Sequence, residues 1–256
     1  MERAEHTYVQ LCGHLVVELE GRRVEQRLPS RQGRLLFAYL MLQRPRAVGR
    51  DELVEAIWSG AAPRHHAAAV TVLLSKLRAA VGAGVLVGRG DVHLALPADA
   101  RVDVEQALAA VHRAESAVVQ RDWARAWSAA LCAQYVADRP LLPGHDDLPW
   151  LDAWRRRLDD TRERALEAYA AACLALGGTE VAGAERAARR LLELNPLRET
   201  GYALLMQALA ARGHVPEALH VYERARTVLR DELGIPPGQA IAGLHSELLD
   251  GRTVSA

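Results

Sequence analysis

The pattern of apolar residues changes at Pro97, and this change constrains the fold of the 256-residue chain more than any other feature. Before Pro97, apolar and polar residues alternate over Val9–Leu19, which predicts one half-buried strand or a pair of strands. After Pro97, alanine-rich segments with helical spacing replace the strand patterns. A chain of this length has room for two domains. We therefore predict a first domain over residues 1–97 and a second over residues 98–256.

The first region has the element pattern of a winged helix-turn-helix. A second strand-like stretch covers Val24–Leu28, and a helix begins near Ser30 and ends before Pro45. A second helix covers Arg50–Trp58, and a third begins in the turn at Pro63 and ends at Gly82. The stretches Val85–Val87 and Val92–Leu94 then read as a β-hairpin, the wing, with Arg89 at its tip.

The third helix predicts one buried stripe and one exposed face. Val70, Leu74, Leu77 and Val81 follow the spacing i, i+4, i+7 and i+11. The opposite face carries small, polar and cationic side chains. In the major groove, hydroxyl groups would meet base edges, Val72 a thymine methyl group, and the cations a guanine or phosphates. The predicted DNA-binding residues are Arg64, His65, Thr71, Val72, Ser75, Lys76, Arg78 and Arg89. The alternative is an ordinary solvated helix face and an arginine without a ligand at the hairpin tip.

The second region predicts an all-α, tetratricopeptide-like repeat domain. The expected helices are Val104–Gln120, Trp123–Ala137, Leu151–Leu176, Val181–Leu194, Glu199–Ala211 and Pro216–Leu233. Leu176-Gly177 recurs in kind at Arg212-Gly213, and Ala184 recurs at Ala218, which are offsets of 36 and 34 residues. A period near 34 residues with glycine between the helices is typical of such repeats. An unrelated helical bundle is the alternative.

Charge separates the two regions and excludes one class of enzyme. Residues 1–97 carry 13 Lys and Arg against 9 Asp and Glu, a difference of +4, whereas residues 98–256 carry 19 against 23, a difference of −4. The first region is therefore the one suited to a polyanion. The only lysine among the 32 basic residues, Lys76, follows no glycine-rich turn, which excludes a Walker-type ATPase. No catalytic constellation is recognisable, so we expect no enzyme activity and no cofactor.

The lack of a membrane-spanning run, of a signal peptide and of disulfide or metal patterns suggests a soluble cytoplasmic protein. The sequence contains no apolar run of about 20 residues and no signal-peptide pattern at its start, so we expect no membrane partner. Cys12, Cys132 and Cys173 are interpreted as buried thiols because their number and spacing fit neither disulfides nor zinc ligands. The adjacent His65-His66 pair points in directions about 100° apart on a helix, so no metal site is predicted.

Two sets of motifs resemble a known family of regulators. RDELVEAIW at Arg50–Trp58, with HHAAAVTVLLSKLRAAVG after it, resembles the OmpR/PhoB-type winged helix. Further on, LLPG, the Pro149-Trp150 pair, ELNPLRE and DELGIPP follow in the order of a bacterial transcriptional activation domain. The combination resembles the SARP family, the Streptomyces antibiotic regulatory proteins.

The resemblance implies an activator of a biosynthetic or regulatory operon. Such a protein binds direct repeats in double-stranded DNA near a promoter, as a homodimer or as protomers side by side, and recruits RNA polymerase. Ala68, Leu73 and Asp91-Val92 depart from the Asn, ring residue and Gly-Tyr that family members often carry, which implies weaker binding or an unusual target. The alternative is a protein-interaction or ligand-sensing adaptor with weak or no specific DNA binding. We also expect a fragment of residues 1–97 to bind DNA without activating transcription.

Overall fold

The computed structural model describes residues 6–60, 63–145 and 148–251, which form two compact units. The first unit contains the chain up to Gln106 together with Arg139–Arg157. The second contains Ala107–Asp138 and the chain from Leu158 onward. The first unit thus continues past the predicted boundary at Pro97 and takes in a later segment of the chain.

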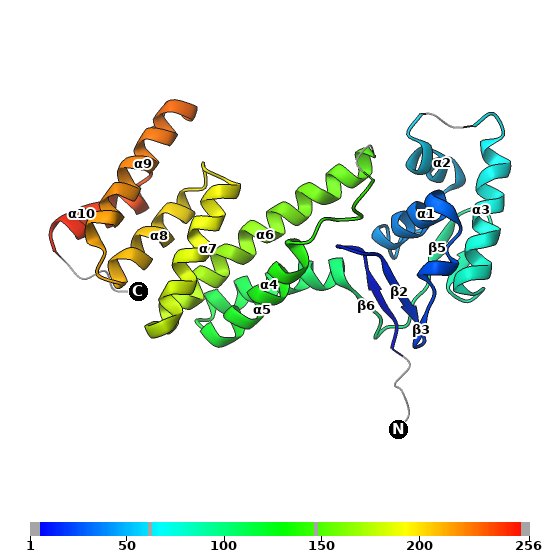
Figure 1. Ribbon diagram of the computed structural model, residues 1–256, viewed down its shortest axis with the longest axis horizontal. Helices are drawn as coiled ribbons and strands as arrows, with labels where there is room; N and C mark the ends of the chain where they lie inside the picture. Colours follow the sequence, from blue (N-terminus) through cyan, green and yellow to red (C-terminus); the bar gives the residue numbers. More distant parts are fainter. Residues whose placement is uncertain (1–5, 61–62, 146–147, 252–256) are drawn as a thin grey trace, which may run out of the picture. The chain divides into compact units, whose positions relative to one another are not determined.

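The first unit combines a sheet, a group of three helices and a hairpin (Figure 1). Its elements are β1 (Tyr8–Gln10), β2 (Val16–Leu19), β3 (Arg22–Arg23), η1 (Glu25–Arg27), α1 (Ser30–Leu42), α2 (Arg50–Trp58), α3 (His66–Val81), β4 (Leu86–Gly88), β5 (Val92–Leu94) and β6 (Arg101–Val102). The sheet has the order β3-β2-β1-β6, and only β1 and β6 run parallel. The winged helix-turn-helix predicted from the sequence is confirmed.

Some details of this unit differ from the sequence prediction. The Val24–Leu28 stretch is not a strand, because its centre forms the 3-10 helix η1. Val24 and Leu28 are both buried, so burial of these apolar residues produced the pattern that resembled a strand. Strand β6 was not predicted, because its two residues are too few to carry an alternating pattern.

The later segment of the first unit packs under α1 and α2. The indole Nε1 of Trp150 donates a hydrogen bond to the carbonyl of Ala56 at 2.9 Å. Its ring lies edge-on to Tyr39, with ring centroids 5.1 Å apart. The tyrosine hydroxyl donates to Glu52 on α2. The Pro149-Trp150 motif thus joins the two helices that support α3.

A buried carboxylate, Asp103, joins the residues that follow β1 to the start of the helix after β6. Asp103 is 1% exposed and accepts backbone N–H bonds from Leu11 and Cys12 at 2.9 Å and from Val104 at 2.8 Å. Arg139 lies 3.8 Å away. Burial raises the pKa of Asp103 and raises the pKa of Cys12 to about 12, so this thiol stays protonated at neutral pH.

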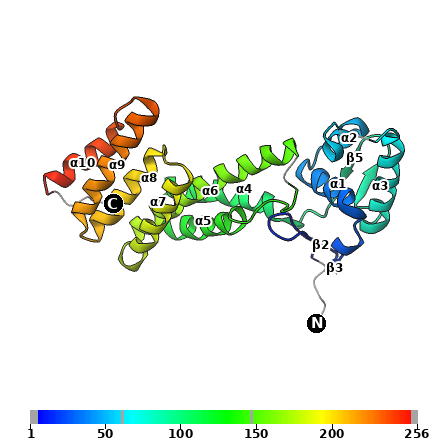
Figure 2. The same ribbon diagram turned by 45° about the horizontal axis from the view of Figure 1, so that its top comes forward.

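The second unit is a series of antiparallel helices. The elements are α4 (Asp103–Val119), α5 (Trp123–Ala137), α6 (Pro149–Leu176), η2 (Gly178–Glu180), α7 (Val181–Leu194), α8 (Glu199–Ala211), α9 (Val215–Leu233) and α10 (Gln239–Leu249). The first residues of α4 and α6 belong to the first unit. Helices α7, α8 and α9 pack in order, and α10 covers α8 and α9 (Figure 2). The tandem hairpins α6–α7 and α8–α9 agree with the predicted repeats.

Small residues allow these helices to approach closely. A Cβ atom at Gly201 on α8 would lie 2.9 Å from Leu192 on α7, so a larger residue there would displace the leucine.

Helix α10 was not predicted, although Ile241, Leu244 and Leu248 bury one face of it. The prediction of three buried thiols was wrong at Cys132, which is exposed. None of the described helices is long and apolar enough to cross a membrane.

Candidate nucleic-acid interface

Helix α3 is held by one apolar stripe and exposes the opposite face. Val70, Leu74, Leu77 and Val81 are all buried, as their spacing predicted. The helix packs against both α1 and α2. A helix that buries a single stripe presents the residues of its other face to solvent. The outer face of α3 is therefore open to a partner.

Four of the predicted DNA-binding residues share this outer face. Thr71, Val72, Ser75 and Lys76 are exposed, and Val72 retains 51% of its accessible surface. None of the described carboxylates forms an ion pair with Lys76. Polar, cationic and apolar side chains on one exposed helix face are the groups that read base edges in a major groove.

Arg64 and His65 lie just before α3 rather than within it. The helix begins at His66, three residues after the turn at Pro63 in which a start was predicted. Both Arg64 and His65 are exposed. They border an open, mostly apolar hollow of about 520 Å³. Its lining also includes Gln32, Trp58, Pro63, Ala68, Ala69, Val72 and Leu73.

The wing is a two-stranded hairpin with an exposed arginine at its tip. Val92 of β5 exchanges two backbone hydrogen bonds with Val48, at 2.8 and 2.9 Å, which ties the wing to the segment before α2. Gly88 has φ +98°, and a Cβ atom there would lie 2.0 Å from the carbonyl oxygen of Asp91. Only glycine fits this tight turn. Arg89 follows it and is exposed.

Arg78 supports the wing from α3. Its Nε atom donates to the carbonyl of Leu86 at 3.2 Å, and its Nη2 atom donates to the carbonyl of Gly88 at 2.7 Å. Arg78 is half-buried. The sequence suggested contact with a guanine or with phosphates, whereas in the structure part of its guanidinium group is already engaged with β4.

Arg50, the first residue of α2, connects α3 to the wing and was missed by the sequence analysis. Its Nη1 atom donates to the hydroxyl of Thr71 at 2.7 Å. Its Nε and Nη2 atoms donate to the carbonyl of Arg89 at 3.3 and 2.9 Å. A cation at a helix N-terminus opposes the helix dipole. That unfavourable position was the one local signal that Arg50 has another role.

The supporting arginines of this region bond neutral groups rather than carboxylates. We define the α3–wing surface as Thr71, Val72, Ser75, Lys76 and Arg89 with the supporting Arg50 and Arg78. Both supporting arginines donate to neutral oxygen atoms. Such bonds fix the position of a guanidinium group without neutralising it. The α3–wing surface therefore combines fixed geometry with net positive charge.

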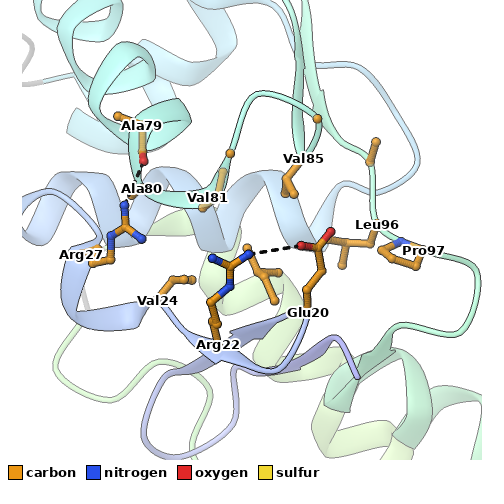
Figure 3. Close-up of a pocket in the computed structure, with 14 residues that line it drawn as sticks. Glu20, Arg22, Val24, Arg27, Ala79, Ala80, Val81, Val85, Leu96 and Pro97 are labelled. Carbon is orange, nitrogen blue, oxygen red and sulfur yellow. Dashed lines mark hydrogen bonds and ion pairs between the residues drawn. The ribbon is translucent and has the colours of Figure 1, made fainter. Parts of the chain in front are cut away.

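A second hollow, of about 540 Å³, lies at the other end of α3. Figure 3 shows Arg27 reaching toward the end of α3, where its Nη2 atom donates to the carbonyl of Ala79 at 3.4 Å. Arg22 forms an ion pair with Glu20 at 3.6 Å. The hollow is also lined by the base of the wing at Val85, Ala95, Leu96 and Pro97.

Comparison with known proteins assigns the chain to a family. Residues 102–249 match the bacterial transcriptional activator domain. The chain belongs to this family. The regulatory protein AfsR of Streptomyces coelicolor is 33% identical across 86% of this chain and 22% of its own length. The transcriptional regulatory protein EmbR of Mycobacterium tuberculosis is 28% identical across 96% of this chain and 64% of its own length.

Other comparisons agree with a bacterial transcriptional activator domain behind a winged helix. The transcriptional regulator RedD of S. coelicolor is 37% identical over 91 residues, and with AfsR it confirms the resemblance to the SARP family. A solved structure of M. tuberculosis EmbR in complex with a low affinity phosphopeptide has a TM-score of 0.85 at 23% identity. The match covers 98% of this chain and 66% of the EmbR chain, and it shows that the two share a fold. The chain spans 22% of AfsR and 64% of EmbR.

The positions at which the resemblance implied departures from the family pattern have different environments. Ala68 is exposed near the start of α3, where a longer polar side chain would reach outward. Leu73 is half-buried and lines the apolar hollow. Val92, the first residue of β5, is fully buried, whereas Asp91 is exposed. Of these positions, Ala68 and Asp91 are therefore the ones that contribute to the exposed surface.

Proposed function

We propose that this protein is a sequence-specific DNA-binding transcriptional activator. The observation that carries the proposal is the α3–wing surface, which places Thr71, Ser75 and Lys76 on one exposed helix face beside the wing. In this arrangement α3 enters the major groove, where hydroxyl groups meet base edges and Val72 meets a thymine methyl group. Lys76 and Arg89 contact phosphates or base edges next to them.

The proposal extends to how the protein acts at a promoter. Its membership of the bacterial transcriptional activator domain family supports a role in recruiting RNA polymerase to a biosynthetic or regulatory operon. Direct repeats about one helical turn apart would place two protomers side by side on one face of the duplex. The second unit supplies protein contacts rather than DNA contacts, because residues 98–256, the region that contains this unit, have an acidic excess. The proposed role requires neither enzyme activity nor a cofactor.

The salt dependence of binding tests the DNA-binding role. Fluorescence anisotropy with a labelled duplex from the promoter adjacent to the gene should give a logarithm of affinity that falls linearly with the logarithm of salt concentration. Lys76→Ala should reduce the slope by about 1, because one fewer counterion is released. Arg156→Ala is the matched control, since Arg156 is exposed on α6 away from α3 in the chain. A slope near zero for the unmodified protein would overturn the proposal.

The ligand-sensing adaptor is the second candidate function. The hollow at the end of α3 favours it, because about 540 Å³ is within the range of small-molecule sites. Under this proposal, occupancy of the hollow changes the protein's partners and specific DNA binding is weak or absent. Footprinting on the adjacent promoter separates the two candidates: a protected direct repeat supports the activator, whereas uniform cleavage supports the adaptor.

A further inference from the structure

Arg50 links the exposed face of α3 to the tip of the wing through its side chain, beside the bonds that Arg78 makes to Leu86 and Gly88. One edge of its guanidinium group bonds the hydroxyl of Thr71, and the other edge bonds the carbonyl of Arg89. These partners are 21 and 39 residues away in the chain. Three N–H groups are engaged, and an arginine has five. Two donors therefore remain for another partner while the link is intact.

The bonds of Thr71 define what its hydroxyl group offers to a base. The hydroxyl donates to the carbonyl of Ala67 at 2.8 Å, and it accepts from Arg50 at 2.7 Å. A hydroxyl group has one hydrogen atom and two lone pairs. Its single donor is used within the helix, so one lone pair is left. Thr71 thus faces outward as a hydrogen-bond acceptor.

We propose that Arg50 is a positioning residue that determines specificity by coupling base readout at Thr71 to the wing contact at Arg89. This inference rests on the DNA-binding function proposed above. With the link in place, Thr71 accepts a hydrogen bond from an exocyclic amino group, which the major groove presents on adenine and cytosine. The same guanidinium group holds the backbone of the wing tip, so the register of α3 also sets where Arg89 meets the duplex.

The competing explanation is that Arg50 simply contacts a phosphate. A phosphate contact depends on charge and on a free donor, and lysine supplies both. The coupling role instead needs donors on separate nitrogen atoms that reach two acceptors at once, which lysine lacks because its three donors share one nitrogen. Arg50→Lys therefore separates the two explanations, while Arg156→Lys controls for the same exchange at an exposed position of α6.

The first experiment measures base preference with the full chain. Each variant binds a pool of duplexes that carry single substitutions in the protected promoter site, and the bound fraction is sequenced. Arg50→Lys should reduce the preference at the Thr71-dependent base pair by about threefold or more, which is the range of coupling between directly bonded groups. Thr71→Val should reduce the preference at the same base pair. Arg156→Lys should match the unmodified protein.

A double-mutant cycle measures the coupling itself. Thr71→Val and Arg89→Ala should have non-additive effects on affinity in the protein with Arg50 and additive effects in the Arg50→Lys background. Amide NMR of the free protein provides a readout without DNA, because Arg50→Lys should increase motion at Arg89 and Gly90. Thermal unfolding verifies that each variant is folded.

The outcomes distinguish the inference from the function on which it rests. If the unmodified protein shows no salt-dependent DNA binding, the proposed function and this role of Arg50 are both wrong. If the protein binds DNA but Arg50→Lys keeps the base preference and the non-additivity, the coupling role of Arg50 is overturned. If Thr71→Val leaves the preference unchanged at every base pair of the site, the assignment of Thr71 as an acceptor from an exocyclic amino group is overturned.

Discussion

The arginines that support the α3–wing surface and the arginines that join helices of the second unit have different partners. In the α3–wing surface, Arg50 and Arg78 donate to a hydroxyl group and to backbone carbonyls. In the second unit, Arg164 pairs with Glu115 at 2.6 Å and Arg198 pairs with Glu167 at 2.8 Å. Arg212 pairs in the same way with the buried Glu185.

The difference shows how one residue type serves two purposes. A carboxylate partner fixes an arginine and cancels its charge, whereas a carbonyl partner fixes it and leaves the charge available. The repeat helices use arginine to join neighbouring helices without creating a basic surface. The α3–wing surface uses arginine to build a rigid and cationic surface. The total number of arginines therefore says less about nucleic-acid binding than the acceptors that they meet.

The largest expected effect is a loss of stability when Trp150, which lies after residue 97, no longer packs on the helices before residue 97. Trp150→Ala should destabilise the protein by about 2–3 kcal/mol, because it removes the packing against Tyr39 and the bond to Ala56. Thermal and urea unfolding measure the loss. Trp150→Phe is the control that keeps an aromatic ring without the N–H donor, and it should lose about 1 kcal/mol.

The same packing sharpens the prediction for a fragment of residues 1–97. The fragment lacks β6, Asp103 and Trp150, all of which belong to the first unit. We therefore expect the fragment to bind DNA but to unfold at a lower temperature than the full chain. A fragment that unfolds at the same temperature as the full chain and binds DNA equally well would show that these contacts contribute little.

The next prediction tests whether the exposed face of α3 reads sequence. Ser75→Ala should narrow the difference in affinity between target and random duplexes by about 1 kcal/mol or more, if its hydroxyl meets a base edge. Competition binding with both duplexes measures the ratio. Ser116→Ala is the matched control, because Ser116 lies on α4 rather than α3 and its hydroxyl is engaged with the carbonyl of His112. If affinity falls equally for both duplexes, Ser75 contacts the DNA backbone instead.

The contrast in arginine partners predicts that Arg78→Ala changes DNA affinity, whereas Arg198→Ala changes the stability of the fold. Arg78→Ala should weaken DNA binding, because the wing carbonyls of Leu86 and Gly88 lose their donor. Arg198→Ala should leave DNA affinity unchanged and lower the free energy of unfolding by about 1 kcal/mol, because its pair with Glu167 is only partly buried. Anisotropy and urea unfolding of both variants test this. A loss of DNA affinity in Arg198→Ala would contradict the division of roles.

Local spacing was enough to predict the parts of the structure that depend on a single element. The buried stripe from Val70 to Val81 and the exposed face with Ser75 and Lys76 both follow from the helical period. The wing followed from two short apolar stretches around a glycine-containing turn. The repeat hairpins followed from the recurrence of glycine and alanine after about 34 residues.

Contacts between distant residues were not predictable from local patterns. Arg50 was missed because its partners lie 21 and 39 residues away. The same holds for Asp103, which binds the backbone of Leu11 from 92 residues away, and for Trp150, which binds Ala56 from 94 residues away. The spacing of α3 shows which side Arg78 faces, but it could not reveal that the carbonyls of Leu86 and Gly88 lie beside it.

The smallest expected effect is a change in acid stability from Glu52 of the first unit, which pairs with an arginine as the glutamates of the second unit do. Arg46 donates to Glu52 at 2.9 Å. This bond, with the Tyr39 hydroxyl, lowers the pKa of Glu52 from 4.5 to about 2. Between pH 4.5 and pH 2 the unfolded chain takes up a proton before the folded protein does. The stabilisation from Glu52 is therefore complete above pH 4.5 and is lost as the pH falls toward 2.

Comparison with a variant isolates this contribution from that of other carboxylates. Arg46→Ala should lose less stability than the unmodified protein between pH 5 and pH 2.5, by less than about 1 kcal/mol because the pair is exposed to solvent. Urea unfolding at the two pH values measures the difference. Arg164→Ala provides the equivalent test in the second unit, where Arg164 lowers the pKa of Glu115. Equal acid sensitivity in Arg46→Ala and the unmodified protein would mean that the pair with Glu52 contributes nothing in solution.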